Sequence, residues 1–439
     1  MFAGVGGFRL GLEGWRPAIQ PGTDEYQVVF SNQWEPSTRV QHASDVYVAR
    51  WGSEGHHNED IFDIVADPAR FVGLAATRPD VLVGGFPCQD YSVANSAARG
   101  IEGKKGGLWW AIHGMLQQLD AAGQPVRHIV LENVDRLLKS PTKRRGADFA
   151  LILASLSSLG YAVEWRVVNA ADFGFAQRRK RVFIVAHHRS TMVGEELAGA
   201  CRTGLARAWL TKDGILGDAF PVETDAGAIT TVRVGSNLLQ VQADFSSAAD
   251  TSPFRNAGVM VDGDVWTADL KVAKTLDYAR YVGIDSPLTL GDVVKGTGTV
   301  PSAFYLAQDT VARWEYLKGA KRETRTKADG FSYVYTEGAV GFPDDLARPS
   351  RTVITAEGGS APSRSKHVVR DETGRLRRLT PDELEVLNGF PRGFTRLDGV
   401  SDVKRAFMMG NALVAGLVAA IGRSLAPRAG VEQAESKAA

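Results

Sequence analysis

The chain has 439 residues, 44% of them hydrophobic and 23% charged, and a formal net charge of +1. These values exclude an extended disordered or fibrous protein, and the length suffices for about two or three domains. Because 51 basic residues balance 50 acidic ones, any nucleic-acid surface must be local. We find no signal peptide and no run near the roughly 20 apolar residues of a membrane span. Two cysteines exclude a disulfide framework and favour a reducing, cytoplasmic setting.

Residues 1–190 alternate short apolar runs with amphipathic stretches. This alternation predicts a parallel sheet with helices on both faces. The expected strands are 28–30, 81–83, 129–131 and 182–185, and the expected helices include 107–119 and 147–159. Residues 191–350 lack a sustained helical period, and Thr- and Val-rich pieces such as 229–234 favour an irregular or β-rich second region.

Two helices are predicted near the C-terminus. Thr380 is the expected N-cap of the first, with Pro381 at its first position and Glu383 as capping-box partner. The second covers 411–426. Its apolar face comprises Leu413, Leu417, Ala420, Ile421 and Leu425. The polar, Ala-rich segment 430–439 is expected to be a disordered tail.

A glycine-rich turn opens the chain at residues 2–8. Such a turn before a helix lets backbone N–H groups approach a cofactor, although a plain tight turn has the same composition. Residues 32–35 follow the first expected strand, and cofactors of doubly wound folds bind at strand ends. Trp34 therefore either stacks on an adenine or packs in the core, and taken alone the core is favoured.

Cys88 follows the strand at 81–83, within the sequence Gly-Gly-Phe-Pro-Cys-Gln. A cysteine at a strand end, in a loop shaped by glycine and proline, is a candidate nucleophile, whereas a lone cysteine is more often a small buried hydrophobe. The stretch 94–107 holds four glycines, Lys104 and Lys105. That composition fits a lid over a charged substrate or a plain solvated loop.

Charged residues mark two further strand ends. Glu132 ends an apolar strand, where a carboxylate must be paired and is either a structural ion-pair partner or an acid working near neutral pH. Arg179 and Arg181 come at the start of the strand at 182–185. Strand alternation sends both arginines to the same side, toward one site.

In this order and spacing, these motifs resemble those of the DNA (cytosine-5) methyltransferases. The matching segments are FAGVGG, SNQWE, GGFPCQ, GGLWW, ENV, QRRKR, RRLTPDELEVLNGFP and GNALV. The resemblance covers 1–190 and about 350–425. It implies an α/β fold, a Rossmann-like S-adenosylmethionine-dependent methyltransferase sheet with helices on both faces, plus a smaller irregular β-rich target-recognition domain. We expect the catalytic domain at 1–190, completed by 405–426, and the recognition domain at 191–404, with its variable core at 191–350.

The resemblance implies methyl transfer from S-adenosylmethionine to C5 of a cytosine flipped out of a specific DNA sequence. The product would be S-adenosylhomocysteine, and no metal is expected. Cys88 would add to C6, because C5 alone is a poor nucleophile toward a methyl group. Glu132 would protonate or hydrogen-bond N3, Arg181 would bond O2, and Arg179 and the lid lysines would stabilise the thiolate. A stacked base is out of reach, so the cytosine must flip.

Matching motif positions imply the remaining roles. The expected cofactor-binding residues are Phe2, Gly4, Gly6, Gln33, Trp34, Asp60, Ile61, Pro87, Leu108, Asn411 and Leu413. The expected DNA contacts are Gln89, Ser92, Lys104, Lys105, Gln177 and Thr352. Gln33 stands where the family usually has an acidic residue, which weakens its bond to a ribose hydroxyl. The family also has a full strand before its first glycine motif, so we expect the natural chain to start further upstream.

Two alternatives stay open on the sequence alone: a tRNA cytosine-5 methyltransferase and a catalytically inactive DNA-binding regulator on the same fold. The length of 191–350 and the basic stretches at 318–327 and 364–378 favour double-stranded DNA. The intact catalytic motifs argue against an inactive protein. We expect a bacterial restriction-modification or phage-defence enzyme, a cytoplasmic monomer without membrane contact. Its expected partner is a separately encoded nuclease or helicase of the same system.

Overall fold

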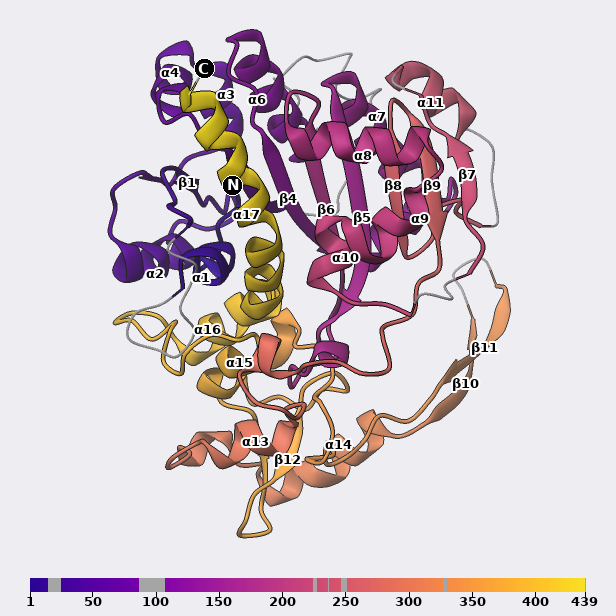
Figure 1. Cartoon of the computed structure of the whole chain (residues 1–439). Helices are drawn as coiled ribbons and strands as arrows, with labels where there is room; N and C mark the ends of the chain where they lie inside the picture. The colour runs from indigo at the N-terminus through magenta and orange to yellow at the C-terminus, as the bar shows by residue number, and fades with distance from the viewer. Residues whose placement is uncertain are drawn as a thin grey trace.

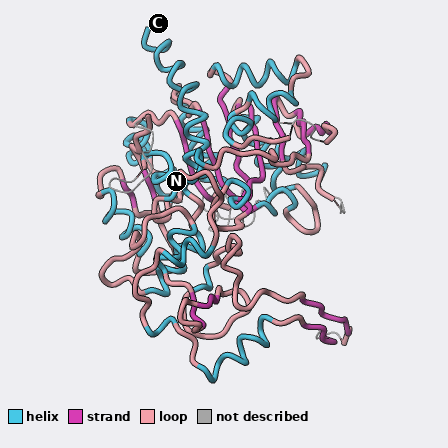
Figure 2. The backbone as a smooth tube through the Cα atoms, turned by 60° about the horizontal axis from the view of Figure 1, so that its bottom comes forward, coloured by secondary structure: helices cyan, strands magenta, loops and turns pink. Residues whose placement is uncertain are grey.

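The computed structural model describes residues 1–14, 25–86, 107–223, 227–235, 237–245, 251–326 and 330–438. Figure 1 shows an upper body built around a large sheet and a lower body of short helices and loops. A two-stranded ribbon projects from the lower body, and Figure 2 shows from a second direction that its end extends beyond the other elements.

The upper body is organised by a seven-stranded sheet of order β3-β4-β6-β5-β8-β9-β7. Its strands are β3 (Val81–Gly85), β4 (His128–Val134), β5 (Tyr161–Asn169), β6 (Lys180–His188), β7 (Thr230–Arg233), β8 (Ala257–Val261) and β9 (Asp264–Ala268). Strands β3 and β4 are parallel, but β6 runs antiparallel to both β4 and β5. The expectation of a parallel sheet is therefore wrong. Residues 170–179, which link β5 to β6, are too few for the crossover that parallel neighbours require.

Helices cover both faces of the sheet, as predicted. Alternate residues of β4 and β6 face opposite sides, so Ile129 and Val182 join one core while Val130 and Phe183 join the other. The first core is closed by α3 (Ile61–Ala66), α4 (Pro68–Ala76), α6 (Trp109–Ala121), α7 (Ala147–Ser158) and α11 (Leu238–Asp244). The second is closed by α1 (Gly7–Glu13), α10 (Ile215–Ala219) and α17 (Ala415–Ala438). Helices α6 and α7 confirm the predicted 107–119 and 147–159.

The sheet continues past the domain boundary that we expected at residue 190. Strands β8, β9 and β7 all follow that residue and extend the sheet beyond β5. Helices α8 (Met192–Arg202) and α9 (Ala206–Ala208) pack on this extension through a separate apolar cluster. The lower body therefore begins only after β9.

A smaller sheet stands beside the large one. It pairs β1 (Ser31–Asn32) with β2 (His56–His57) in parallel, and α2 (His42–Trp51) connects them. Strand β1 starts beyond the predicted 28–30. The Met1 amino group donates to the Val83 carbonyl (2.6 Å), and the Ala3 N–H donates to the Asn32 carbonyl (2.9 Å). Residues 1–3 thus join the two sheets, and burial lowers the pKa of the Met1 amino group to about 5.

The helix predicted at 411–426 corresponds to α17, which starts at Ala415, after α16 (Asp402–Asn411) has ended. Leu417, Ala420 and Ile421 are buried, which confirms the predicted apolar face. Helix α17 continues to Ala438, whereas we expected 430–439 to be disordered. The Ala, Glu, Gln and Lys residues of that segment are strong helix formers, which accounts for the difference.

The stretch Asp402–Gly430 is long and apolar enough to cross a membrane by length and composition, contrary to our sequence analysis. However, 78% of its apolar window is buried inside the protein. It packs against α1 and α10 in the second core, as Figure 1 shows. Such burial is typical of the core helix of a folded domain.

The lower body combines short helices with two antiparallel strand pairs. Its helices are α12 (Ala279–Val282), α13 (Leu290–Lys295), α14 (Val311–Lys318), α15 (Pro381–Leu387) and α16. Its strand pairs are β10 (Lys321–Thr326) with β11 (Ser332–Glu337), and β12 (Val368–Arg370) with β13 (Leu376–Arg378). The core of α13, α15 and α16 also contains Val5 and Leu10, so the two bodies share apolar packing.

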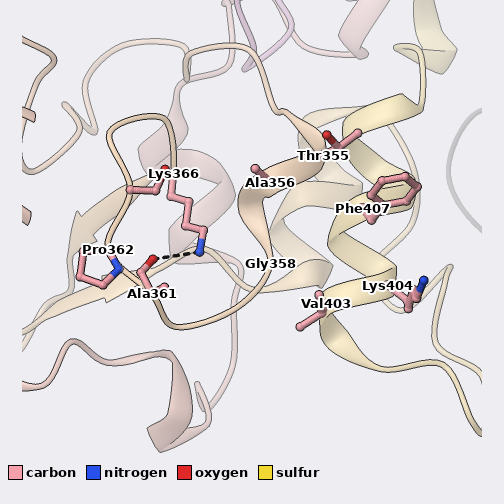
Figure 3. A pocket seen from close by; sticks show the side chains of 10 residues that line it. Thr355, Ala356, Gly358, Ala361, Pro362, Lys366, Val403, Lys404 and Phe407 are labelled. Atoms are coloured by element: carbon pink, nitrogen blue, oxygen red, sulfur yellow. Dashed lines mark hydrogen bonds between the residues drawn. The ribbon is translucent and has the colours of Figure 1, made fainter. Parts of the chain in front are cut away.

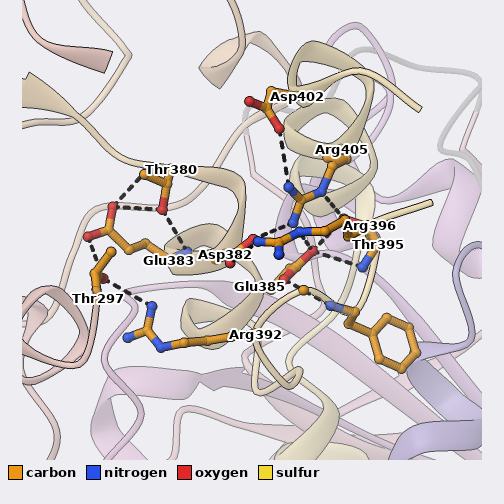
Figure 4. Close-up of polar contacts among 12 residues, drawn as sticks. Thr297, Thr380, Asp382, Glu383, Glu385, Arg392, Thr395, Arg396, Asp402 and Arg405 are labelled. Carbon is orange, nitrogen blue, oxygen red and sulfur yellow. Dashed lines mark hydrogen bonds and ion pairs between the residues drawn. The ribbon is translucent and has the colours of Figure 1, made fainter. Parts of the chain in front are cut away.

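Buried carboxylates fix α15 in the lower body (Figure 4). The capping box is formed as predicted: Glu383 N–H donates to the Thr380 hydroxyl (3.3 Å) and Thr380 N–H donates to the Glu383 carboxylate (2.7 Å). The same carboxylate pairs with Arg377 at 2.7 and 2.9 Å and accepts from the Thr297 hydroxyl (2.8 Å). Glu383 is 0% and Arg377 2% exposed, so each charge depends on the other.

We predict that Glu383→Ala lowers the free energy of unfolding by about 3–5 kcal/mol, because it leaves the buried Arg377 charge without a partner. Urea denaturation followed by circular dichroism measures this. Asp402→Ala is the matched control, since Asp402 is largely exposed in its contact with Arg405 and its loss costs about 1 kcal/mol or less. Equal losses from the two variants would show that burial does not set the value of these ion pairs.

Candidate active site

Two charged residues meet where β4 ends and β6 begins. Glu132 is opposite Phe183 and Val134 is opposite Arg181 in the antiparallel ladder. Arg181 is therefore offset from Glu132 by two residues, so both side chains lie on the same face. Arg181 Nε lies 2.8 Å from Glu132 Oε1, and the side chains are 16% and 12% exposed. Glu132 and Arg181 therefore lie next to each other, as their expected roles on a single cytosine require.

The Glu132 carboxylate retains capacity for a ligand. Its Oε1 atom is buried and has no aligned hydrogen bond from a described residue, because the contact with Arg181 is an ion pair without hydrogen-bond geometry. A buried acceptor without a donor is unfavourable. A hydrogen-bond donor on a bound substrate could bond to this oxygen while the ion pair with Arg181 is retained.

The end of β3 lies against the same carboxylate. Gly85 is opposite Glu132, and a Cβ on Gly85 would lie 3.5 Å from Glu132 Oε2. The Asn133 side chain donates to the Phe86 carbonyl (2.8 Å), which fixes the point where the chain leaves the sheet. We did not assign a role to Asn133 from the sequence, although its place after a strand-end glutamate was a usable signal.

The predicted nucleophile follows that point directly. Pro87, Cys88, Gln89, Ser92, Lys104 and Lys105 lie outside the described residues. The structure nevertheless describes the residue on either side of this segment. Phe86 is buried at the end of β3, and the Gly107 carbonyl accepts from the Trp110 N–H (2.8 Å) as α6 begins.

Arg179 immediately precedes β6, and its partners differ from the thiolate that the resemblance implies. Its guanidinium donates to the Val353 carbonyl (3.1 Å) and the Gly410 carbonyl (3.2 Å), and the residue is 2% exposed. Burial lowers its pKa to about 9, Arg181 adds to that effect, and Glu132 opposes it. The group remains a cation at neutral pH and joins β6 to the lower body.

Gln177 is not placed for the predicted DNA contact. It is 0% exposed, and its amide donates to the Leu387 carbonyl (2.9 Å) and to Asn388 Oδ1 (2.9 Å). Its carbonyl accepts from the Val353 N–H (2.9 Å). The side chain is buried because it forms hydrogen bonds with three buried polar groups. Thr352, by contrast, is partly exposed, and its hydroxyl donates to the Arg178 carbonyl (2.6 Å).

A pocket of about 450 Å³ lies between the loop after the 3₁₀-helix η7 (Thr355–Glu357) and α16 (Figure 3). Val403 and Phe407 line one wall. Lys366 lines another, but its ammonium donates to the Gly359 and Ala361 carbonyls (3.0 and 2.9 Å). Of the predicted catalytic residues that the structure describes, Glu132, Arg179 and Arg181, none lines this pocket, so we do not identify it with the active site.

The N-terminal turn has the conformation of a tight glycine turn. Phe2, Gly4 and Gly6 have positive φ, and a Cβ on Gly6 would collide with the Trp51 ring. A Cβ on Gly4 would meet no described atom within 4 Å, so that backbone faces open space. The Gly4 N–H donates to Gln33 Oε1 (2.7 Å), so the side-chain carbonyl of Gln33 braces the turn.

The other predicted cofactor residues fall into two groups. Trp34 is 40% exposed, so the core-packing reading is wrong and its ring is open to stacking. Asn411 is exposed at the end of α16, and Leu108 and Asp60 are partly exposed. Asp60 caps α3 by accepting from the Phe62 N–H (3.0 Å). Ile61 and Leu413 are instead buried, the first in the core and the second against Gly7. Their side chains therefore support the expected cofactor site by packing and are not exposed to a ligand.

Comparison with known proteins places these features in a family. The profile described as C-5 cytosine-specific DNA methylase matches residues 1–233 and 271–426. The unmatched residues 234–270 hold α11, β8 and β9. Type II methyltransferase M.Sau3AI from Staphylococcus aureus is 38% identical over 97% of this chain and 94% of its own length. Type II methyltransferase M.NgoBI from Neisseria gonorrhoeae is 34% identical over 42% of this chain and 48% of its own.

Solved structures show the same fold at low identity. A DNMT2 structure from Spodoptera frugiperda aligns with a TM-score of 0.54 at 12% identity, covering 97% of both chains. The Entamoeba histolytica methyltransferase EhMeth aligns with a TM-score of 0.52 at 12% identity, covering 97% of this chain and 95% of its own. These likenesses support the Rossmann-like methyltransferase sheet.

The contact that Arg179 makes with α16 gives a prediction for stability. A Cβ on Gly410 would collide with backbone atoms of Ile354 and Thr355, so Gly410→Ala must displace the segment that Arg179 binds. We expect a loss of about 1–3 kcal/mol in the free energy of unfolding. Gly73→Ala in α4, where a Cβ would meet nothing within 4 Å, is expected to stabilise by about 0.5–1 kcal/mol. Thermal denaturation of both variants measures the contrast, and a neutral Gly410→Ala would contradict the close packing.

Proposed function

The chain belongs to the C-5 cytosine-specific DNA methylases, and on that premise we propose that Cys88, Glu132 and Arg181 carry its chemistry. The protein is a DNA cytosine-5 methyltransferase and transfers a methyl group to C5 of cytosine in DNA. The observation that carries the residue assignment is the Glu132–Arg181 pair beside Phe86, from which the chain leads directly to Cys88.

Cys88 is the nucleophile in this proposal. Its thiolate forms a bond to C6 of the cytosine, and the C5–C6 electron pair moves into the ring, which makes C5 nucleophilic. The thiolate requires a pKa below the free value of about 8.5 for useful reactivity at neutral pH. After C5 has been methylated, loss of the C5 proton restores the double bond and expels the thiolate of Cys88.

Glu132 and Arg181 recognise and polarise the ring. The guanidinium of Arg181 donates to O2, and the carboxyl group of Glu132 bonds N3 and the exocyclic amine. Protonation or strong hydrogen bonding at N3 neutralises the charge that enters the ring during thiolate addition. Because both side chains are largely buried at the strand ends, the cytosine must leave the duplex stack to reach them.

S-adenosylmethionine is the cofactor that the family implies, and the described residues fit it. The Gly4 backbone faces open space, and the exposed ring of Trp34 follows the residue that braces that turn. We propose that Phe2, Gly4 and Gly6 hold the methionine end, and that Trp34 and Asp60 contact the adenine. Gln33 would reach the ribose, while Pro87, Leu108 and the 411–413 segment would close the site. When bound, this cofactor supplies the electrophilic methyl group.

We further propose that the protein modifies host DNA in a restriction-modification system. The support is the 38% identity to a Type II methyltransferase over nearly the whole of both chains. A separately encoded nuclease that cuts the same sequence would be its functional partner, in the cytoplasm. The target sequence would be read by the lower body together with the segment before it.

We predict that Cys88→Ser abolishes methyl transfer while the affinity for DNA changes little. DNA containing 5-fluorocytosine traps the covalent adduct, since the fluorine cannot leave C5 as a proton does, and a denaturing gel detects it. Cys201→Ala is the matched control because Cys201 lies on the buried face of α8, and burial raises its pKa to about 12. Adduct formation by Cys88→Ser, or its loss in Cys201→Ala, would contradict the assignment.

We predict that Glu132→Gln lowers the rate of methyl transfer by about 10²–10⁴-fold, because the amide keeps the size of the side chain but cannot supply the N3 proton. Bisulfite sequencing of treated DNA measures the rate at each site. A native-like melting temperature would show that the fold survives the change. A rate within about threefold of the wild-type enzyme would remove Glu132 from the mechanism.

A further inference from the structure

The β10–β11 ribbon lacks the usual support of a strand pair. Its two strands pair from Lys321↔Glu337 to Thr326↔Ser332, and no third strand joins them among the described residues. Figures 1 and 2 agree that it projects from the lower body. An isolated two-stranded ribbon is only marginally stable in water, so its extended form suggests that it works against a partner.

The base of the ribbon is nonetheless firmly held. Arg364 pairs with Glu337 (2.8 Å) and donates to the carbonyls of Leu317 and Gly319 (3.2 Å each) and of Gly338. Next to it, Lys318 is 1% exposed and donates to the Lys366 carbonyl (2.6 Å). The ribbon is thus a preorganised arm on a fixed base, which lowers the entropic cost of binding.

The two faces of the ribbon differ in charge. Along one face lie Lys321, Glu323, Arg325, Tyr333, Tyr335 and Glu337. On this face Arg325 pairs with Glu323 (3.2 Å) and stacks on the Tyr335 ring (3.6 Å to its centre), while Glu337 is held by Arg364. Both carboxylates of the two strands are therefore on this face and neutralised.

The opposite face carries no carboxylate. It consists of Arg322, Thr324, Thr326, Ser332, Val334 and Thr336. All six residues are exposed, and Arg322 forms no ion pair within the described structure. The face offers a row of hydroxyl and methyl groups with one unpaired guanidinium. We call it the threonine face.

We propose that the threonine face of the ribbon enters the major groove of the DNA substrate and reads bases there. This rests on the proposed function, which makes duplex DNA the substrate. The major groove admits a two-stranded ribbon, and its base edges accept from Arg and bond Ser or Thr hydroxyls, while thymine methyl groups pack on Thr methyl groups. A strand of six residues spans roughly 20 Å, enough for several base pairs.

Charge favours DNA over a second copy of this chain as the partner. Because Glu323 and Glu337 are paired with arginines, the positive charges of Lys321 and Arg322 remain near the base of the ribbon. Lys321 lies over the Tyr316 ring (4.8 Å), and Arg313 lies over the same ring (5.6 Å). A positive ribbon meeting its own copy would be repelled, whereas phosphate groups flanking a groove attract it. The test must therefore distinguish DNA binding from self-association, in which the exposed edges of two ribbons would pair.

The experiment compares Arg322→Ala with Arg325→Ala in the full-length enzyme. Both variants remove one positive charge from the same strand, but from opposite faces. We measure binding to duplex DNA carrying the methylated sequence, and methyl transfer at low and saturating DNA. We expect Arg322→Ala to weaken binding and kcat/KM by about 5- to 150-fold, with kcat at saturating DNA preserved, and Arg325→Ala to change both by less than about threefold.

Sequence preference gives a second measurement. Thr324→Val and Thr326→Val keep the shape of the threonine face, and each removes one of its four hydroxyl groups. Bisulfite sequencing of a randomised DNA library is expected to show a relaxed or changed preference at defined positions for these variants. Tyr335→Phe, which removes a hydroxyl group from the opposite face of the ribbon, serves as the control.

Three results would overturn the proposal. Equal losses for Arg322→Ala and Arg325→Ala would show general electrostatic attraction without a reading face. Unchanged affinity and preference in all variants would remove the ribbon from the DNA interface. A wild-type dimer by light scattering that becomes a monomer in Val334→Lys would assign the ribbon to self-association. The wild-type enzyme is assayed alongside each variant. If the wild type were inactive on every DNA, the proposed function itself would fail, and that result is distinct from the three above.

Discussion

Residues 177–181 connect the lower body to the candidate catalytic residues at the centre of the sheet. Gln177 bonds the backbone of α15 and Val353, Arg179 bonds Val353 and Gly410, and Arg181 meets Glu132. This alternating set of contacts runs from the lower body into the centre of the sheet. The position of the candidate catalytic arginine is therefore fixed by two buried residues that do not reach the substrate.

Burial of Arg179 is unfavourable unless its charge is compensated, and the structure compensates it with peptide dipoles. Gly410 is in the last turn of α16, where the partial negative charge of a helix C-terminus favours a cation. Arg179 also opposes Arg181 electrostatically, and Glu132 attracts both. The three groups thus form one coupled unit, and a change in the lower body at Gly410 can reach Glu132 through Arg179.

The sequence was most informative where a local rule determines the structure. The Thr380–Glu383 capping box, the strand ends at Glu132 and the apolar face of α17 all follow from spacing alone. Partners distant in the sequence could not be predicted. Strand alternation predicted that Arg179 and Arg181 lie on one side. It could not show that Arg179 would donate to the Gly410 carbonyl of α16 while Arg181 would pair with the Glu132 carboxylate. The reversal of β6 was likewise hidden, because apolar runs look alike in either direction.

The proposed base-reading face is attached to the protein in a different way from the candidate catalytic residues. Gln177 and Arg179 are buried and each bonds several buried polar groups, so most substitutions at these two positions disturb both the fold and the geometry of the site. The threonine face of the ribbon touches no core, and its fixed base depends on Arg364 and Lys318, which lie outside the two strands. Side chains on that face can change without altering the sheet or the Glu132–Arg181 pair. A methyltransferase built in this way can acquire a new target sequence while its catalytic residues stay in place.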